Sequence, residues 1–501
     1  MIALLPLDDR PCNTRFPAQI AAIGADALNQ PPRPALGRFN VSGDFSALKA
    51  WLDALPDVSA LVVSVDMLAY GGLVASRKTT TPLPVALERL ETLRAFRAAR
   101  PQVPIYAFNV LMRLAVTMDS DAAVPHYYNV MKWARLSDEA VRFPTPENQL
   151  ALNEVRALIP DAILDSYLEA RRRNHEVNLR MIDWLADGVF DHLLITQEDC
   201  TQFGLHRREQ DALVARARER GVTDGFTLHP GADEAALTLI ARGWNEGVSF
   251  RVHWSNPDHK RAIAIFEDIP YEDALHSHIK ALRGRVAEDG EAAQVQLFVN
   301  APVTAPANGS QKNETRESRA ERRAAFEREF LPAIARALDA GQRVALCDVA
   351  FPNGADETLM NAIEGFGGEI FARLSAYGGW NTAGNTTGTL LAQCVALARG
   401  ARLGAPHSAE LNRDFLFERL LDDWFYQANL RARLEAQARD EGFSPLSMNG
   451  HTHRIETSAR HEIARFADQL AADHFGREVR DLRVELPWGR TFEVSVGAKL
   501  S

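Results

Sequence analysis

Short apolar runs recur along the chain, and segments with a helical pattern of apolar and charged positions separate most of them. The runs occupy residues 2–7, 61–67, 105–111, 192–196, 226–229, 250–254, 262–266, 295–300, 344–349 and 370–375. Strands that alternate with helices indicate βαβ units and mostly parallel sheets. The runs are apolar almost throughout, as expected for strands that are covered on both faces.

The pattern changes after about residue 400. Residues 415–438 and 458–475 predict long helices, and residues 482–485 with 491–496 predict a closing hairpin around Pro487-Trp488-Gly489. We expect this region to form a C-terminal helical appendage that serves packing or oligomerisation. A homo-oligomer is therefore left open.

The length of 501 residues exceeds what one ordinary hydrophobic core supports. The predicted fold class is α/β, with two lobes of mostly parallel sheet, barrel-like or doubly wound, followed by the helical appendage. The predicted boundaries are an N-terminal lobe at 1–245, a second lobe at 246–400 and the C-terminal region at 401–501.

The composition excludes several classes of partner and compartment. A net charge of -10 argues against nucleic acid, which needs clustered Lys and Arg on one face. The basic runs at 171–173 and 316–323 contain or adjoin glutamates in helical patterns, so we interpret them as solvated salt-bridge faces. The first apolar stretch stops at Asp8 and Asp9, and no run is long enough to span a membrane. We expect a cytoplasmic protein without a membrane partner.

The four cysteines are widely spaced and form no C-x-x-C pair. Neither a disulfide framework nor a structural zinc site is indicated.

Polar residues follow nearly every predicted strand. Ligands on parallel sheets bind beyond the carboxyl ends of the strands, where these residues are expected to gather. Connecting loops are polar too, but they do not need this much glycine beside carboxylates and aromatic residues, so we favour a functional edge. The candidates are Asp8, Asp9, Arg10, Asp66, Tyr70, Asn109, Arg113, Glu198, Asp199, Asp233, Asn300, Asp348, Asn353, Asp356, Trp380, Asn381 and Asn385.

The familiar catalytic signatures are missing from the sequence: it has no phosphate-binding P-loop, no G-x-G-x-x-G after the first strand, no G-x-S-x-G and no H-E-x-x-H. The remaining carboxylates, amides and aromatic residues suit a polyhydroxylated ligand. Asp9, Asp66 and Asp199 are the catalytic candidates, because paired carboxylates can divide into acid and base. The other candidates, with Glu198 behind the catalytic three, are expected to bind the substrate. Each carboxylate has an alternative role as a helix cap or as a partner of Arg10 or Arg113.

No cofactor is expected, although the same carboxylates could hold a divalent metal ion, for which His229 is the best-placed histidine. A hydrogen-bonded loop histidine is the alternative. His451 and His453 form an H-x-H pair that would share one face of a strand, but no third ligand is near them in the sequence.

Two loops share the sequence Gly-Ala-Asp-Glu, at 230–234 and 352–357. Each is either a well-capped helix start or a set of amides that holds a substrate oxygen, and the echo hints at two similarly built lobes. The polar segment 304–315 is expected to be a mobile loop, either a lid or a plain surface connection.

Four motifs resemble one uncharacterised bacterial family, the domain of unknown function numbered 4127. They are L-P-L-D-D-R-P at 5–11, D-x-x-x-Y-G-G-L at 66–73, D-x-x-x-x-G at 199–204 and Y-G-G-W-N-T-A-G-N-T at 377–386. The resemblance spans nearly the whole chain, and the last motif is its most specific part. It implies no activity.

A weaker likeness connects 348–356 with the glycine-rich loop of metal-dependent microcystinase-like peptidases, although this chain lacks the second aspartate and the longer glycine run of that pattern. The functional hypothesis is a hydrolase that acts on a sugar or sugar-derived small molecule through paired carboxylates in a cleft between the lobes. A metal-dependent amidohydrolase and a non-catalytic sugar-binding or sensory protein are the alternatives.

Overall fold

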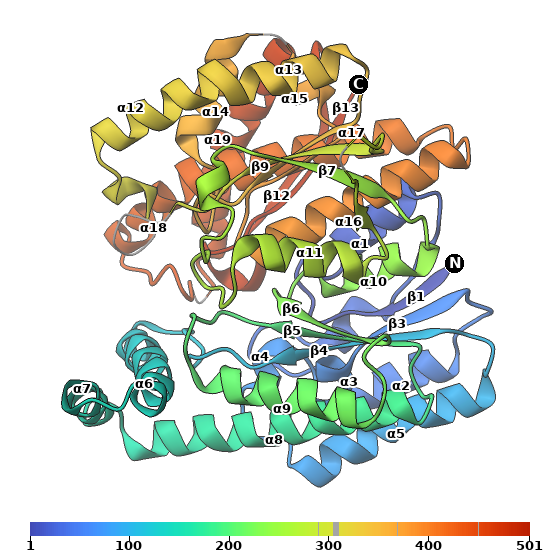
Figure 1. Ribbon diagram of the computed structural model, residues 1–501, viewed down its shortest axis with the longest axis vertical. Helices are drawn as coiled ribbons and strands as arrows, with labels where there is room; N and C mark the ends of the chain where they lie inside the picture. The colour runs from blue at the N-terminus through green and yellow to red at the C-terminus, as the bar shows by residue number, and fades with distance from the viewer. Residues whose placement is uncertain (289, 304–309, 368, 449) are drawn as a thin grey trace. The chain divides into compact units, whose positions relative to one another are not determined.

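The computed structural model describes residues 1–501 except 289, 304–309, 368 and 449. The chain divides into two compact units (Figure 1). The first unit comprises 1–18 and 26–243, and the second comprises 19–25 and 244–501. Among the described residues, no helix has the length and apolar character needed to cross a membrane.

The first unit is built on an open parallel sheet of six strands in the order β2-β1-β3-β4-β5-β6. This is the strand order of one common doubly wound fold, extended by one strand. The strands are β1 (Ile2–Leu5), β2 (Leu28–Asn29), β3 (Ala60–Ser64), β4 (Ile105–Leu111), β5 (His192–Gln197) and β6 (Phe226–Pro230). The predicted mostly parallel α/β class is confirmed, in its doubly wound form.

The helices of the first unit cover the sheet and extend beyond it. They are α1 (Arg15–Ile23), whose second half belongs to the second unit, α2 (Phe45–Asp53), α3 (Val65–Tyr70), α4 (Leu73–Ser76), α5 (Leu83–Ala99), α6 (Val124–Arg142), α7 (Pro146–Arg156), α8 (Asp161–Ala186), α9 (Leu205–Glu219) and α10 (Ala235–Trp244). Helices α5, α8 and α9 lie side by side along one face of the sheet (Figure 1). Their apolar stripes pack on the strands, for example Val177 and Met181 of α8 in one core with Leu193 of β5.

The second unit repeats the same topology in its own sheet. Five parallel strands lie in the order β11-β10-β9-β7-β8, which is again the order 2-1-3-4-5 when read from β8. The strands are β7 (Ser249–Trp254), β8 (Arg285–Val286), β9 (Val295–Asn300), β10 (Val344–Asp348) and β11 (Ala376–Gly378). The expectation of two similarly built sheets agrees with this topology.

Helices α11 to α19 belong to the second unit. They are α11 (Tyr271–Ala281), α12 (Arg316–Ala325), α13 (Leu331–Asp339), α14 (Glu357–Phe366), α15 (Ile370–Arg373), α16 (Ala383–Arg402), α17 (Ser408–Arg419), α18 (Arg431–Asp440) and α19 (Thr452–Leu470). A π-helical stretch, Leu420–Leu430, joins α17 to α18, and shorter ones precede α13 and follow α19. Strands β12 (Val479–Glu485) and β13 (Ser495–Leu500) form the predicted antiparallel hairpin, with the second strand a few residues later than expected.

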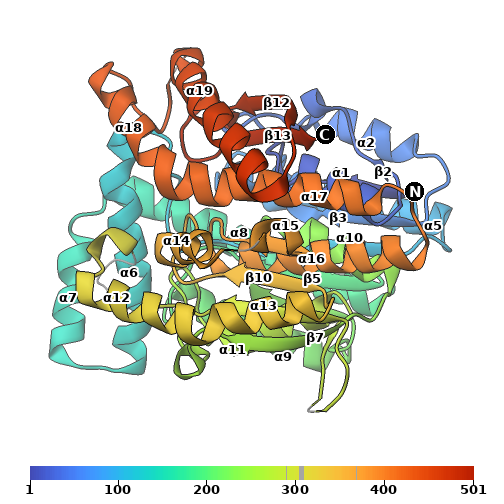
Figure 2. The same cartoon turned by 90° about the horizontal axis from the view of Figure 1, so that it is seen from above.

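The C-terminal helices share one core with the second sheet (Figure 2). Phe298 and Leu346 of the sheet lie in the same apolar cluster as Leu416 of α17 and Ile463 of α19. The predicted boundaries near 245 and 400 stay predictions.

Two predicted strands are wrong. Residues 262–266 form no strand, and Ile263 makes only an isolated bridge to Pro270, which has no N–H to continue a ladder. Residues 370–373 form α15, because Ile370, Phe371 and Leu374 are buried at helical spacing, and the strand begins later, at Ala376. A short apolar run does not distinguish a strand from a buried helical turn.

Candidate functional site

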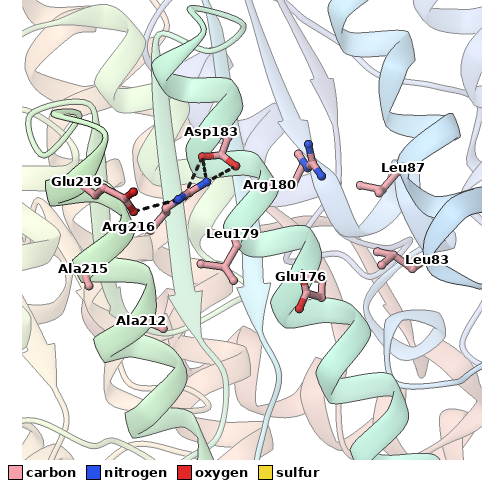
Figure 3. Close-up of a pocket in the computed structure, with 10 residues that line it drawn as sticks. All are labelled: Leu83, Leu87, Glu176, Leu179, Arg180, Asp183, Ala212, Ala215, Arg216 and Glu219. Carbon is pink, nitrogen blue, oxygen red and sulfur yellow. Dashed lines mark hydrogen bonds and ion pairs between the residues drawn. The ribbon is translucent and has the colours of Figure 1, made fainter.

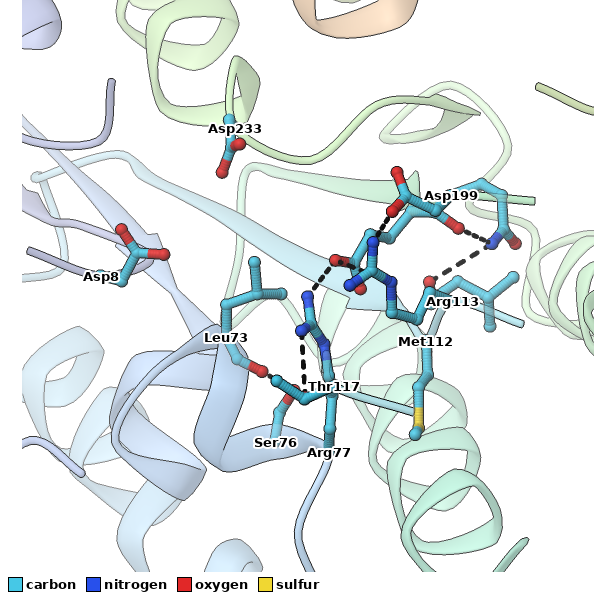
Figure 4. Close-up of polar contacts among 12 residues, drawn as sticks. Asp8, Leu73, Ser76, Arg77, Met112, Arg113, Thr117, Asp199 and Asp233 are labelled. Atoms are coloured by element: carbon cyan, nitrogen blue, oxygen red, sulfur yellow. Dashed lines mark hydrogen bonds and ion pairs between the residues drawn. The ribbon is translucent and has the colours of Figure 1, made fainter. Parts of the chain in front are cut away.

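The carboxyl ends of the strands in the first unit carry a network of charged side chains. Arg10, four residues beyond the first proline after β1, donates to Asp8 Oδ2 at 2.7 Å and to Asp233 Oδ1 at 2.5 Å. Asn13 Nδ2 donates to the same two carboxylates, at 2.9 Å and 3.2 Å. Figure 4 draws both carboxylates, one after β1 and one after β6. These bonds tie together two loops that are more than 200 residues apart in the sequence.

A second group lies at the ends of β4 and β5. Arg113 forms an ion pair with Asp199 (Figure 4), and its Nε lies 3.7 Å from Glu198 Oε1. Arg77, which follows α4, forms an ion pair with Glu198 and also donates to Thr117 Oγ1 at 3.3 Å. Burial alone would raise the pKa of Glu198, but the nearby guanidinium groups of Arg77 and Arg113 outweigh it and lower that pKa. Glu198 is therefore an ionised carboxylate.

Asp66 lies in the first turn of α3, directly after β3. Ser64 caps this helix by accepting from Met67 N at 3.1 Å, which fixes the turn that carries Asp66. Asp66 Oδ2 accepts from Val110 N at 2.9 Å, while Oδ1 is buried and has no hydrogen-bond partner among the described residues. Burial raises the pKa of Asp66 to about 7, and the negative charge of Glu198 adds to this rise.

Other buried polar atoms near these strand ends also lack a partner within the described part of the chain: Glu198 Oε2, Asn178 Nδ2 and Thr196 Oγ1. Asn178 accepts a hydrogen bond from Asn109, whose own Oδ1 accepts from Val110 N at 3.2 Å, beside Asp66. Buried polar atoms are nearly always satisfied in proteins, so a group of unsatisfied ones indicates an unseen water, ion or ligand.

Asp9 and Tyr70 complete the sequence-predicted set in this unit. Asp9 is buried, and Arg33 Nη2 lies 3.6 Å from its Oδ2. The guanidinium of Arg173 stacks over the Tyr70 ring, with Cζ 4.3 Å from the ring centroid. The loop after Tyr70 needs glycine, because Gly72 has φ +119° and a Cβ there would lie 3.2 Å from Leu7 O.

Arg171 and Arg173 contradict the prediction of a solvated basic run. Only Arg172 is exposed, whereas Arg171 and Arg173 are buried in α8. Arg171 Nη1 donates to Met112 O at 2.8 Å, and Arg173 donates to three backbone carbonyls of the segment 76–81. The available signal was spacing, because Arg171, Asn174 and Asn178 fall on the same helical stripe as the apolar residues of α8.

His229 and Glu234 each bond a backbone group of the 230–234 loop, while Glu234 Oε1 has no hydrogen-bond partner among the described residues. His229 Nδ1 lies 2.9 Å from Pro230 O, and burial lowers its pKa to about 4. Glu234 Oε2 accepts from Ala232 N at 2.8 Å, and burial raises the pKa of Glu234 to about 8. The loop amide of Ala232 is thus bound by the chain's own Glu234.

In the second unit, Asn300 joins the ends of β9 and β10. Its Nδ2 donates to Asp348 Oδ1 and to Asp356 Oδ2, both at 2.9 Å. Asp356 also caps α14 by accepting from Thr358 N at 3.0 Å, and it forms an ion pair with Arg322. The capped helix start is therefore the arrangement observed for the 352–357 loop.

The loop from Tyr377 to Thr386 begins inside β11 and ends in the first turn of α16. Asn353 and Asn381 both have left-handed backbones, with φ of 61° and 52°, and Asn353 N donates to Asn381 O at 2.8 Å. Trp380 is 6% exposed and Asn385 is 4% exposed. Of the segment 304–315, residues 304–309 lie outside the described residues.

His451 and His453 do not lie on a strand. His451 precedes α19, and His453 is the second residue of that helix. The ring of His451 stacks on Phe443, with the ring centroids 4.2 Å apart.

One family model, described as a protein of unknown function (DUF4127), matches residues 2–497. The chain belongs to this family. The resemblance drawn from the sequence motifs is confirmed, and no curated protein matches the chain.

The motifs that carry the DUF4127 resemblance fall at strand ends in both units. The first supplies Asp8 and Arg10 after β1, the second supplies Asp66 on α3, and the fourth runs from β11 into α16. In this DUF4127 chain the motifs therefore mark the carboxyl edges of both sheets.

A groove of about 720 Å³ lies elsewhere in the first unit, between α5, α8 and α9 (Figure 3). Leu83, Leu87 and Leu179 line it, and Arg216 pairs with Asp183 at 2.8 Å at its side. None of the sequence-predicted site residues lines this groove.

Proposed function

We propose that this protein is a hydrolase that acts on a sugar or sugar-derived small molecule at the carboxyl edge of the six-stranded sheet. Asp66 is the general acid, and Glu198 is the ionised carboxylate that works with it. The observation that carries the proposal is the Asp66 carboxyl group, which is buried, has one oxygen without a partner among the described residues, and has a pKa raised to about 7.

The argument rests on how the environments separate two neighbouring carboxyl groups. Burial and the charge of Glu198 raise the pKa of Asp66 to about 7, so that about half of the Asp66 carboxyl groups are still protonated at neutral pH. Arg77 and Arg113 hold Glu198 ionised, although it is buried. A carboxyl pair whose pKa values are pushed apart can donate a proton from one member while the other activates water or stabilises positive charge.

The unsatisfied atoms near this pair support a hydroxylated substrate. Asn178 Nδ2 offers a donor, Glu198 Oε2 offers an acceptor, and Thr196 Oγ1 can do either. Sugar hydroxyls both donate and accept, so one ring can satisfy such a mixed set. Asp199, already paired with Arg113, would orient that guanidinium toward Glu198 rather than react.

The first test is turnover of a panel of p-nitrophenyl glycosides by the wild type, Asp66→Asn and Glu198→Gln. Each variant should lose about 10²–10⁴-fold in kcat/KM, because an amide cannot transfer the proton. Wild-type kcat/KM should fall above pH 7, as Asp66 loses its proton. Asp183→Asn, a change on the distant helical groove, is the control and should keep full kcat/KM.

Full activity of Asp66→Asn would remove the general acid from the proposal. A non-catalytic sugar-binding or sensory protein would show thermal stabilisation by sugars with no product after prolonged incubation. A metal-dependent amidohydrolase would release product from amides and lose that activity on chelation. The proposal also places the enzyme in the cytoplasm with a carbohydrate as its partner, and a homo-oligomer stays open.

A further inference from the structure

In the second unit, buried carboxylates at the end of β10, before α12 and α14 and in the π-helical stretch Leu420–Leu430 outnumber the arginines that pair with them. Arg322 pairs with Asp356 and Glu314, and the fully buried Arg419 pairs with Asp422 and Asp423 at 3.0 Å each. Asp348 forms no ion pair within the described part of the chain. It accepts hydrogen bonds from Asn300 Nδ2 at 2.9 Å and from Asp356 N at 2.7 Å.

This group contains five carboxylates and three guanidinium groups, because Arg319 Nε also lies 3.8 Å from Glu314 Oε2. Buried charges in proteins are normally paired or coordinate metal ions. The group therefore carries an excess of negative charge, which a bound cation would neutralise.

A second, independent observation is the hydroxyl of Tyr377. The side chain is 0% exposed, and its hydroxyl has no hydrogen-bond partner among the described residues. Tyr377 of β11 is in register with Leu346 of β10, and Asp348 lies two residues further along β10. Side chains two residues apart on a strand share a face, so Tyr377 and Asp348 lie on the same face of the sheet.

The position of Gly379 locates this hydroxyl. A Cβ on Gly379 would lie 2.6 Å from Tyr377 Oη and 3.4 Å from Ala355 Cα. Gly379 N donates to Asp423 Oδ2 at 2.9 Å, and Ala355 N donates to Asp423 O at 2.9 Å. The hydroxyl therefore lies beside Gly379, whose amide is bonded to the Asp423 carboxylate. Burial raises the pKa of Tyr377, and the negative charges of Asp348, Asp423 and Asp356 raise it further.

We infer that Asp348, Asp423 and the Tyr377 hydroxyl bind a divalent cation of the Mg²⁺ or Ca²⁺ class. The donor atoms are all oxygens, which these hard cations prefer, and Mg²⁺ in particular is commonly held by one or two carboxylates with water completing its shell. The cation offsets the excess negative charge and gives the hydroxyl oxygen a partner. This site lies in the second unit and does not depend on the proposed reaction at Asp66.

The inference is tested by binding to the full-length protein after treatment with EDTA. Calorimetric titration with Mg²⁺, Ca²⁺ and Mn²⁺ should show one site for at least one of them, and the same ion should raise the melting temperature. Asp348→Asn should weaken binding by at least about tenfold, in line with the loss of a metal ligand or its support. Asp339→Asn, an exposed residue paired with Arg373 in the same unit, is the matched control and should bind like the wild type.

Tyr377→Phe gives a readout that a purely structural tyrosine would not give. Without a cation, the variant should melt at or above the wild-type temperature, since it removes a buried hydroxyl that has no partner among the described residues. With the cation, it should show a smaller rise in melting temperature than the wild type. Tyr271→Phe is the control, because its hydroxyl bonds Thr387 Oγ1 at 2.8 Å and its loss should lower the melting temperature equally with and without the ion.

Two results would overturn the inference. One is a wild type that binds none of the three ions and melts at the same temperature with and without them. The other is an Asp348→Asn variant that binds with wild-type affinity. Either result leaves the glycoside assays of Asp66→Asn untouched, so the two proposals fail separately.

Discussion

Asp66 shows how one buried carboxyl group can link stability to pH. Its pKa is raised from 3.8 to about 7, chiefly by burial. The folded state then binds more protons than the unfolded state between these values, so the stabilising contribution is complete below about pH 4 and is lost as pH rises to 7. An Asn side chain does not ionise, so Asp66→Asn does not lose stability in this way as pH rises.

We therefore predict that Asp66→Asn gains stability relative to the wild type between pH 5 and pH 8. The expected gain is about 2–3 kcal/mol, since each pKa unit corresponds to about 1.4 kcal/mol. Urea unfolding at both pH values measures it. The exposed Asp339→Asn variant should follow the wild type at both, and a constant difference between Asp66→Asn and the wild type would contradict the raised pKa.

At this scale the positions of Asp66 and Glu198 just after strands could be predicted from the sequence, whereas their protonation states could not. Asp66 and Glu198 were found because each follows a strand, and chain order alone fixes that. Their protonation states depend on Arg77 and on depth of burial, which no spacing reveals. Tyr377 was recognised only as part of a glycine-rich motif, because the absence of a hydroxyl partner is a three-dimensional property.

At the scale of elements, α8 holds the segment that presents Arg77. Arg173 donates to Ser76 O at 2.5 Å, to Lys78 O at 2.7 Å and to Thr81 O at 2.8 Å, while Asn174 Nδ2 also donates to Ser76 O at 2.8 Å. The two carbonyls that flank Arg77 are thus fixed by one helix.

We predict that Arg173→Ala destabilises the first unit by about 3 kcal/mol, because three carbonyls lose a charged donor and some remain buried. Amide exchange in residues 77–81 should rise with it, as hydrogen-exchange mass spectrometry would detect. The adjacent Arg172→Ala change removes an exposed side chain and should stay within about 0.5 kcal/mol of the wild type. Equal effects of the two changes would mean that the contacts of Arg173 add nothing.

Elements were predictable where periodicity and length agreed. Residues 105–111 and 295–300 are strands over the predicted range, because runs rich in β-branched or aromatic residues favour a buried strand of a parallel sheet. Residues 370–373 failed because four apolar residues fit a helical turn equally well. The buried face of α8 was missed because charge was taken as a sign of exposure, whereas arginine can be buried when backbone carbonyls accept hydrogen bonds from its guanidinium group.

At the scale of the whole molecule, the second sheet has the strand order 2-1-3-4-5, and the first sheet has the same order with a sixth strand added. The loops at 230–234 and 352–357 that suggested a repeat follow the sixth strand of one sheet and the fourth of the other. They are therefore not equivalent positions, and their aspartates differ in role: Asp356 caps α14, whereas Asp233 pairs with Arg10. No sequence feature predicted that the second half of α1 belongs to the second unit.

The packing of the end of α1 in the second unit can be tested at Gly400 of α16. A Cβ there would lie 2.4 Å from Ile23 O and 2.0 Å from Ser408 Oγ. We predict that Gly400→Ala destabilises the second unit by about 1–3 kcal/mol through overpacking. Gly365→Ala in α14 meets only the end of the Arg323 side chain at 3.4 Å, so it should be neutral or stabilising by up to about 1 kcal/mol. Calorimetric melting compares the pair, and a stabilising Gly400→Ala would contradict this close contact.

The place of residues 19–25 in the second unit also orders events on the ribosome. Ser408 Oγ donates to Ile23 O at 2.7 Å across 385 residues of sequence, and Arg399 bonds Gly24 O across 375. At a synthesis rate of roughly 5–20 residues per second, Arg399 and Ser408 are synthesised on the order of 20–75 s after residues 19–25. During that interval the end of α1 is a nascent segment without its final neighbours, so the second unit completes its folding only late in translation.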